Sequence, residues 1–175
     1  MHESELHKLI LDVPDFPKAG VNFKDMTPLL ADPSALSLAV ELMANPYRGE
    51  GVELVVGAES RGFIFGTAIA QTLSAGFVPV RKPGKLPRAV HGMDYDLEYG
   101  TDRLEIHADA ISKGQKILLV DDVLATGGTM RAKCDLAEKI GAEIVGITVL
   151  IELQFLEGRK KLGTHGESVH GVLKY

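Results

Sequence analysis

Two adjacent carboxylates follow an apolar run in the middle of the chain. Residues 117–130 read ILLVDDVLATGGTM, so Asp121 and Asp122 lie between a predicted buried strand and a glycine turn. The glycines let the backbone turn its amides inward before a helix begins at Thr129, and the N-terminus of a helix suits a phosphate. Thr126 and Thr129 can add hydroxyl donors. The pattern therefore predicts a cradle for a monophosphate.

The two carboxylates set this loop apart from other phosphate loops. The lysine of GxxxxGK[ST] is absent here, and the sequence contains no GxGxxG. Neighbours on an extended strand point to opposite faces, but at the end of a strand both can turn into one crevice. Carboxylates there can accept hydrogen bonds from a sugar diol and lie near a divalent cation. On spacing alone, a solvated junction between strand and helix explains the stretch about as well.

The composition narrows the class of protein. The 175 residues are 45% hydrophobic and 25% charged, which is typical of one globular domain. A net charge of −5 does not favour a nucleic-acid partner. Cys134 is the only cysteine, which excludes an intrachain disulfide and favours a reducing compartment. Without a signal peptide or an apolar run near the roughly 20 residues of a membrane span, we expect a cytoplasmic protein with no membrane partner.

Strands and helices alternate through most of the chain. Proline at 14 and 17 should end an early helix over 5–11 that Ser4 caps, a loop should cover 20–30, and Asp32-Pro33 should start a helix reaching about Met43. Buried strands are expected at 52–57, 77–80, 116–120 and 143–151, with helices at 63–74, closed by Gly76, and 129–140, closed by Gly141. This order predicts an α/β fold, a mostly parallel twisted sheet flanked by helices, with ligands at the carboxyl ends of the strands.

Residues 81–107 interrupt this alternation. They begin with RKPGKLPR, four cations among prolines and a glycine, and end in alternating apolar positions at Tyr95, Leu97, Tyr99, Leu104 and Ile106. The alternation is typical of half-buried antiparallel strands, so a hairpin should leave the parallel sheet here. Long insertions in α/β domains are often lids, although a basic run of this kind is more often a solvated loop.

The stretch 117–130 resembles, nearly residue for residue, the phosphoribosyl-pyrophosphate motif of the type I phosphoribosyltransferases. The resemblance implies that family's fold, with an N-terminal hood and a flexible β-hairpin lid. It implies Mg2+ as cofactor, with Asp121 and Asp122 holding the ribose hydroxyls and the metal, directly or through water. The implied 5'-phosphate site consists of Ala125, Thr126, Gly127, Gly128 and Thr129.

Two further stretches resemble the base-binding parts of the adenine-using members of this family. In residues 15–30, DFPKAGVNFKDMTPLL, the hood phenylalanine is Phe23, which would stack on the purine while backbone groups read its edge. Some relatives have an apolar residue at position 22 and arginine at position 24; backbone recognition tolerates both changes, whereas side-chain recognition does not. Phe23 as a simple packing residue is the alternative. The implied adenine-binding residues are Val21, Asn22, Phe23, Lys24 and, after the last core strand, Leu153, with Phe155 as a weaker candidate.

Three stretches resemble the pyrophosphate side of the family's site. In GAESRGFIFG, residues 57–66, Ser60 and Arg61 would bind pyrophosphate, and the Glu59-Ser60 peptide bond would be cis. In YDLEYG, residues 95–100, Glu98 would act as general acid or base at the purine, with Tyr99 beside the pyrophosphate. Taken alone, Arg61 is an exposed helix-start residue and Glu98 an outward strand residue. The basic run would add Arg81, Lys82 and Lys85, so that the implied catalytic residues are Glu98, Arg61 and Lys85.

The resemblance implies one phosphoribosyltransferase domain over 1–175, with a hood at 1–33 and a flexible loop at 81–107. The implied function is purine salvage, in which a homodimeric transferase moves the phosphoribosyl group of phosphoribosyl pyrophosphate to adenine and forms AMP and pyrophosphate. A xanthine or other purine phosphoribosyltransferase is the nearest alternative. A regulator with this fold is a more distant one, because the chain is acidic and has no winged-helix segment before the hood.

Overall fold

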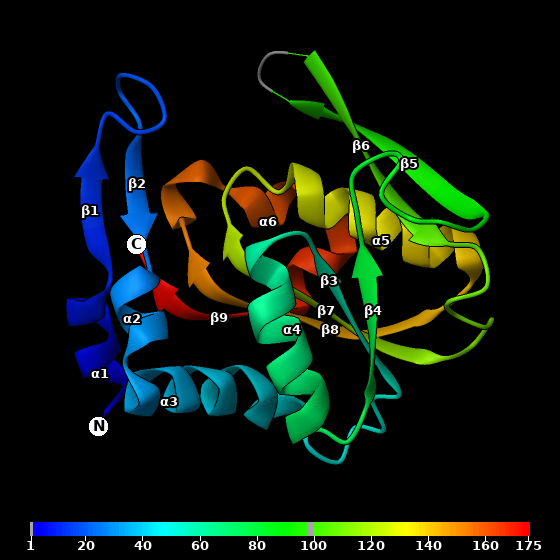
Figure 1. The fold of residues 1–175 in the computed structure, drawn as a ribbon, viewed down its shortest axis with the longest axis horizontal. Coiled ribbons are helices and arrows are strands. Elements are labelled where there is room, and N and C mark those ends of the chain that lie inside the picture. The colour runs from blue at the N-terminus through cyan, green and yellow to red at the C-terminus, as the bar shows by residue number, and fades with distance from the viewer. Residues whose placement is uncertain (1, 98–99) are drawn as a thin grey trace.

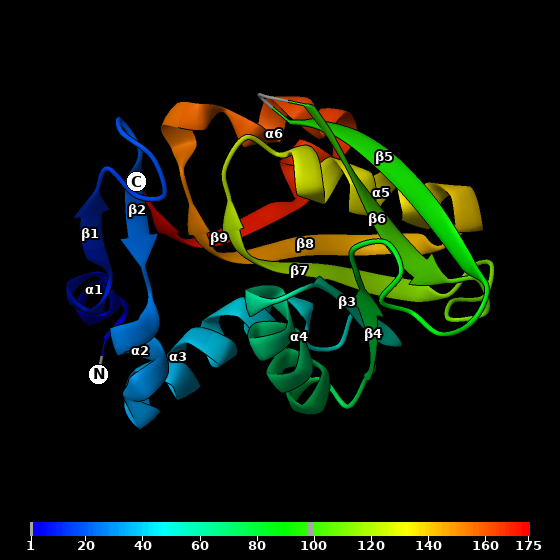
Figure 2. The same ribbon diagram turned by 45° about the horizontal axis from the view of Figure 1, so that its top comes forward.

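The centre of the molecule is a five-stranded parallel sheet. The structure, a computed structural model, describes residues 2–97 and 100–175. In the sheet order β4-β3-β7-β8-β9, the strands are β3 (Leu54–Ala58), β4 (Gly76–Val80), β7 (Lys116–Leu124), β8 (Glu143–Glu152) and β9 (Val169–Lys174). Helices cover both faces of the sheet (Figures 1 and 2). The predicted α/β fold is therefore confirmed.

Two hydrophobic cores lie on the two faces of this sheet. Along β7, Leu118 and Val120 pack into the core that contains α3 (Pro33–Ala44) and α4 (Arg61–Thr72). Ile117 and Leu119 pack into the other core, with α5 (Gly128–Ile140). Because side chains of a strand alternate between faces, the continuous apolar run that marked this strand in the sequence serves both cores.

The strand order places a crevice between β3 and β7. From β3 the chain crosses through α4 to β4 on one side, and it later continues through β7 on the other side of β3. The segments that follow β3 and β7 therefore diverge at the carboxyl edge of the sheet, and ligands bind at such switch points. The first turns of α4 and α5, which follow β3 and β7, therefore lie at this edge of the sheet.

The N-terminal segment pairs two short strands beside the sheet (Figure 1). It contains α1 (Glu3–Leu6), a 3-10 turn (His7–Leu9), β1 (Leu11–Pro14), β2 (Asn22–Asp25) and α2 (Thr27–Ala31). The predicted helix over 5–11 is thus too long and capped by His2 rather than Ser4, and the predicted loop over 20–30 holds a strand and a helix. The antiparallel pairing of β1 with β2 decides this, because neither short strand has a clear local pattern.

The predicted hairpin is confirmed. β5 (Val90–Leu97) and β6 (Gly100–His107) pair antiparallel, with Val90 opposite His107. The hairpin lies along α5 in both views (Figures 1 and 2). Leu104 and Ile106 are buried in the same core as α5, so one face of the hairpin belongs to the body of the molecule.

Several predicted boundaries differ from the structure. β7 continues past 120 to Leu124, because β8 runs beside it and pairs Leu124 with Glu152. The left-handed residue after α4 is Ser74 (φ 55°), while Gly76 already belongs to β4. The edge strand β9 had no counterpart among the predicted strands. The helix ending at Gly141 and the helix capped by the Asp32 carboxylate agree with prediction.

Between β8 and β9 the chain forms three short helical pieces. These are the 3-10 turn Gln154–Leu156, α6 (Gly158–Lys161) and the 3-10 segment Gly163–Ser168. Over the residues that the structure describes, every helix falls short of the length and apolar character that crossing a membrane requires.

Candidate active site

A pocket of about 390 Å³ opens at the carboxyl ends of β3, β7 and β8 and reaches the hood strand β2. Its lining comes from segments that are far apart in the sequence. Ten of the predicted site residues line it: Val21, Asn22, Phe23, Lys24, Arg61, Asp121, Asp122, Ala125, Thr129 and Leu153. The pocket is also lined by Glu59, Val123 and Leu156, which were not predicted. An apolar residue after a strand, such as Leu156, gives no sequence signal for a site.

The glycine turn forms a second, smaller cavity next to this pocket. Residues 123–130 line a space of about 80 Å³, and they include the predicted Thr126, Gly127 and Gly128. Gly127 has a φ of 88° and is the N-cap of α5. A Cβ atom at Gly127 would lie 2.6 Å from the carbonyl oxygen of Gly158, so the position requires glycine for both its backbone angle and its space.

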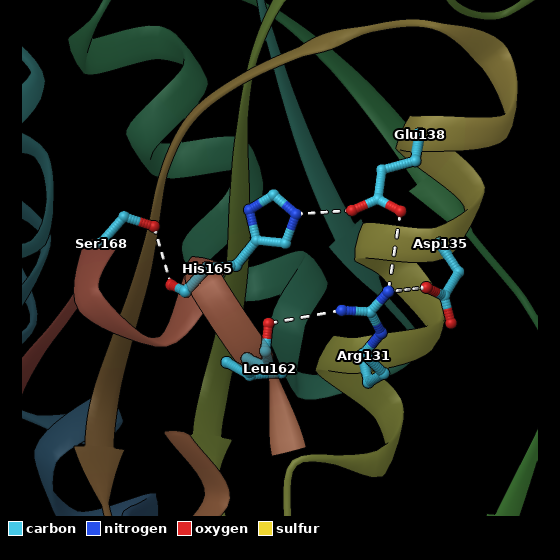
Figure 3. A network of polar contacts seen from close by, with 6 residues as sticks. All are labelled: Arg131, Asp135, Glu138, Leu162, His165 and Ser168. Carbon is cyan, nitrogen blue, oxygen red and sulfur yellow. Dashed lines mark hydrogen bonds and ion pairs between the residues drawn. The ribbon is translucent and has the colours of Figure 1, made fainter. Parts of the chain in front are cut away.

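A polar network fastens the chain behind this turn to α5 (Figure 3). Arg131 on α5 pairs with Asp135 and donates to the carbonyl oxygen of Leu162 over 3.3 Å. Nε2 of His165 lies 2.6 Å from Glu138, also on α5. The segment that begins at Gly158 is thereby held against the helix whose first turn forms the cavity.

The two aspartates have different partners. The carboxylate of Asp122 is buried, and its Oδ2 atom lies 2.5 Å from Nε of Arg61, at the start of α4. Among the described residues this buried oxygen is paired with Arg61 alone, and that contact is an ion pair rather than an aligned hydrogen bond. Burial and the neighbouring charge of Asp121 raise the pKa of Asp122 to about 7, although Arg61 opposes the shift.

Asp121 faces a lysine that was not predicted as a site residue. Nζ of Lys133, on α5, donates to Asp121 Oδ2 over 2.7 Å and to the carbonyl oxygen of Val120 over 2.8 Å. The Lys133 side chain is completely buried. Its helical spacing from the buried residues Met130 and Ala137 places it on the inner face of α5, which is the signal that a sequence reading could have used.

The hood aromatic Phe23 borders the pocket from β2. Its ring packs edge to face on Phe16, with 5.2 Å between ring centroids. The guanidinium carbon of Arg61 lies 5.2 Å from the centroid of the Phe23 ring, within the range of a cation–π contact. Arg61 therefore bridges the hood aromatic and the Asp122 carboxylate.

The side chains of Asn22 and Lys24 are engaged by the neighbouring strand β1. Asn22 donates to Asp12 Oδ1 over 3.2 Å, and the Lys24 ammonium donates to the same oxygen over 2.5 Å. Nζ of Lys24 also lies 4.1 Å from the ring centroid of Tyr175. Strand alternation puts both side chains opposite Phe23, so the groups that they can offer to the pocket are those of the backbone.

The loop after β3 has the predicted cis peptide bond between Glu59 and Ser60. The Glu59 carboxylate accepts from Nε of Arg81 over 3.1 Å and from the backbone amide of Lys82 over 2.8 Å. Ser60 is the N-cap of α4 and does not line the pocket. Glu59 thus ties this loop to the start of the basic run.

The basic run 81–88 lies outside the pocket lining, and most of its cations are paired. Besides the Arg81–Glu59 pair, Lys82 binds Asp102 and the hydroxyl of Tyr95 on the hairpin, and Arg88 binds Asp109. Burial tends to lower the pKa of Lys82, but these hydrogen bonds outweigh it and raise that pKa. Within the described part of the chain, Lys85 is the cation of this run that forms no ion pair. The run is held at several points rather than free.

Three remaining predictions are not placed in the pocket. Glu98 and Tyr99 lie outside the residues that the structure describes. Phe155 is 68% exposed and does not line the pocket.

Comparison with known proteins assigns the family. The phosphoribosyl transferase domain family matches residues 27–166. The adenine phosphoribosyltransferase of Methylococcus capsulatus is 54% identical over 98% of this chain and 99% of its own length. The solved adenine phosphoribosyltransferase of Thermoanaerobacter pseudethanolicus is 46% identical with a TM-score of 0.95, covering 99% of this chain and 100% of its own. That of Giardia lamblia, complexed with 9-deazaadenine, is 38% identical with a TM-score of 0.95, covering 100% and 98%. The chain belongs to the phosphoribosyl transferase domain family and, within it, to the adenine phosphoribosyltransferases.

Proposed function

We propose that the pocket between the hood and the sheet is where this chain carries out the reaction of its family. That reaction transfers the 5-phosphoribosyl group of phosphoribosyl pyrophosphate to adenine and forms AMP and pyrophosphate. The observation that carries the proposal is the convergence of four segments in one cavity: the hood strand, the loop after β3, the acidic pair and the glycine turn. Each segment suits a different part of the two substrates.

The sugar phosphate is assigned to β7 and the turn that follows it. Backbone amides at the start of α5, with the hydroxyls of Thr126 and Thr129, would hold the 5'-phosphate. Asp121 and Asp122 would accept hydrogen bonds from the ribose hydroxyls. Both ends of the ribose would then be held against rigid elements, which favours an orientation ready for reaction.

Pyrophosphate is assigned to the α4 side of the pocket. When pyrophosphate leaves C1, positive charge develops on the ribose ring and negative charge on the leaving group. Arg61 would stabilise the leaving group, after giving up its contact with Asp122. Ser60, Arg81, Lys82, Lys85 and Tyr99 remain proposed pyrophosphate contacts, and for Lys82 a contact of this kind requires that it leave Asp102.

Adenine is assigned to the space between Phe23 and Leu153. The Giardia relative was solved with 9-deazaadenine, an adenine analogue, which supports a purine as the ligand of this chain. The face of the Phe23 ring that Arg61 now contacts is the surface on which a purine would stack. We assign the proton transfer at the purine to Glu98, and edge recognition to the backbone of residues 21–24.

The acidic pair suits Mg2+. Proteins commonly bind this ion through one or two carboxylates together with substrate phosphates and water, and the buried Asp122 Oδ2 atom would become available to it when the partly exposed Arg61 moves to the pyrophosphate. Asp121 and Asp122 would hold the ion, directly or through water. When bound, Mg2+ would neutralise charge on the pyrophosphate and orient it.

Three further parts of the proposal concern organisation. We treat 1–175 as one domain in which residues 1–33 form the hood and 81–107 a lid. We expect a homodimer, which light scattering on the purified protein would test. A cytoplasmic location is supported by the cysteine content, because Cys134 is the only cysteine and no disulfide can form within the chain.

A direct assay tests the function. The protein is incubated with phosphoribosyl pyrophosphate, Mg2+ and, in separate reactions, adenine, hypoxanthine, guanine or xanthine, and nucleotide formation is followed. We expect AMP from adenine and little product from the other bases. A nucleotide from xanthine but not from adenine would overturn the proposed base site, and replacing Mg2+ with a chelator should abolish turnover.

A further inference from the structure

We propose that Lys133 is a positioning residue for ribose recognition, acting through the carboxylate of Asp121. The proposal rests on the function proposed above for the pocket. It concerns a side chain that does not line that pocket but contacts one of its acids from behind.

The burial of Lys133 indicates a specific role for its charge. The side chain has no exposed surface, although an unpaired ammonium in a protein interior is strongly destabilising. Its neighbours on the inner face of α5, among them Met130 and Ala137, are apolar core residues. An apolar side chain would fill the same place in this core at lower cost in desolvation, so the charge is explained by what the ammonium contacts.

Those contacts lie at one point of β7. Nζ donates to the carbonyl oxygen of Val120 and to Oδ2 of Asp121, over 2.8 and 2.7 Å. Oδ1 of Asp121 accepts the backbone amide of Asp122 over 3.1 Å. Both carboxylate oxygens are therefore engaged, and the carboxylate has one orientation.

The opposite side of Asp121 is closed as well. Gly62, in the first turn of α4, lies so close that a Cβ atom there would come within 2.8 Å of Asp121 Oδ1. The carboxylate is thus enclosed between α4 and α5, with the buried ammonium as its cationic partner. It can present only its remaining acceptor directions to the pocket, which fixes where a ribose hydroxyl must lie.

Nucleotide binding without catalysis tests this role. The affinities of AMP, 2'-deoxy-AMP and 3'-deoxy-AMP are measured by calorimetry for the wild type and for Lys133→Met. We expect the wild type to bind AMP about tenfold more tightly than at least one deoxy analogue, which corresponds to about 1.4 kcal/mol. Lys133→Met should reduce this ratio to near one and leave the affinity for the analogue almost unchanged.

Two outcomes would overturn the proposal. If Lys133→Met lowers the affinity for all three nucleotides equally, or only lowers Tm, the ion pair of Lys133 with Asp121 is merely structural. If Lys139→Met, on the exposed end of α5, reduces the ratio to the same extent, the effect is not specific to Lys133. A wild type that binds none of the nucleotides would instead contradict the proposed function of the pocket, so the two failures are distinct.

A double variant keeps the test decisive if Lys133→Met folds poorly. Lys133→Met with Asp121→Asn removes both buried charges together, which such sites often tolerate. If Lys133 acts through Asp121, the double variant should bind each nucleotide like Asp121→Asn alone. Additive losses of affinity would show that Lys133 acts by another route and would refute the proposal.

Discussion

On the α4 side of the carboxyl edge Asp122 faces Arg61, whereas on the α5 side Asp121 faces Lys133. The two acids are adjacent on one strand, but their partners differ in exposure: the Arg61 side chain is 43% exposed, and the Lys133 side chain is fully buried. An exposed guanidinium can exchange its carboxylate for a ligand phosphate at little cost, because solvent compensates during the exchange. A fully buried ammonium, such as that of Lys133, cannot make this exchange, because solvent does not reach it to replace the lost carboxylate.

Under the proposed function, the difference separates a side of the site that can rearrange from a side that is fixed. On the α4 side, Arg61 contacts both Asp122 and the Phe23 ring, so binding of pyrophosphate and of a purine would both require it to move. On the α5 side, the glycine turn packs against Gly158, and the Figure 3 network fixes the segment behind it. We infer that the α4 side rearranges during turnover while the α5 side holds the sugar phosphate still.

The largest effect is expected from removing the exchangeable cation. Arg61→Ala should lower kcat/KM by roughly a hundredfold to a thousandfold, because it removes charge stabilisation of the leaving pyrophosphate, and steady-state kinetics would measure it. The free energy of unfolding should also fall, because the buried Asp122 carboxylate loses its cationic partner, so the kinetics are measured on protein shown to be folded. The matched control is Arg48→Ala, which removes an exposed pair with Glu41 away from the pocket. A loss below threefold for Arg61→Ala would place the reacting side elsewhere.

The next effect concerns the rigid side. Gly127→Ala places a Cβ atom 2.6 Å from the Gly158 carbonyl oxygen at a φ of 88°. It should raise KM for phosphoribosyl pyrophosphate by roughly tenfold to a hundredfold, because the turn must shift, and it should lower stability by about 1–2 kcal/mol or more. Gly114→Ala is the control, with a φ of 81° but no atom near the added Cβ. If both variants behave alike, the backbone angle and not the contact with Gly158 is responsible.

A smaller effect should appear as a pH dependence of stability. With a folded-state pKa of about 7 against an ordinary value of 3.8, Asp122 binds its proton more tightly in the folded protein. Its contribution to the free energy of unfolding should therefore fall as pH rises from about 4 to 7, by at most about 1.4 kcal/mol per pH unit, and stay constant above that range.

Urea denaturation of the wild type and of Asp122→Asn at pH 5, 6, 7 and 8 isolates this contribution, because the other titrating groups are common to both proteins. The stability difference between the two should change mainly below pH 7. A difference that is independent of pH would mean that Arg61 keeps the carboxylate ionised throughout.

The smallest effect is expected from Lys24, whose side chain lies on the face of β2 opposite Phe23. Lys24→Met removes an ammonium that binds Asp12, so the KM for adenine should change less than about threefold and stability by about 0–1 kcal/mol. Phe23→Ala in the same strand is the contrasting variant and should weaken adenine binding clearly, by roughly 1–3 kcal/mol, the range seen when an aromatic that stacks on a base is removed. A tenfold rise in the adenine KM of Lys24→Met would show that its side chain reaches the base.

Much of the fold and of the candidate site could be predicted from the sequence. The apolar runs, the cap at Asp32 and the glycine at 141 are local signals, and they located most of the core strands and helices. The stretch ILLVDDVLATGGTM predicted a phosphate cradle beside two acids because its acids, glycines and threonines are neighbours in the chain, and these residues line the pocket and the small cavity next to it. The hairpin was predictable for the same reason, since alternation is a property of consecutive residues.

Tertiary structure alone decided the partners. Strand order brought the start of α4 beside Asp122 and the inner face of α5 beside Asp121, so that two identical neighbouring side chains received an exposed and a buried cation. It also paired β1 with β2 and neutralised most of the basic run with acids distant in sequence. Local patterns report burial and turns, whereas these pairings depend on which segments the topology brings together, and that is settled only when the whole sheet and both cores form.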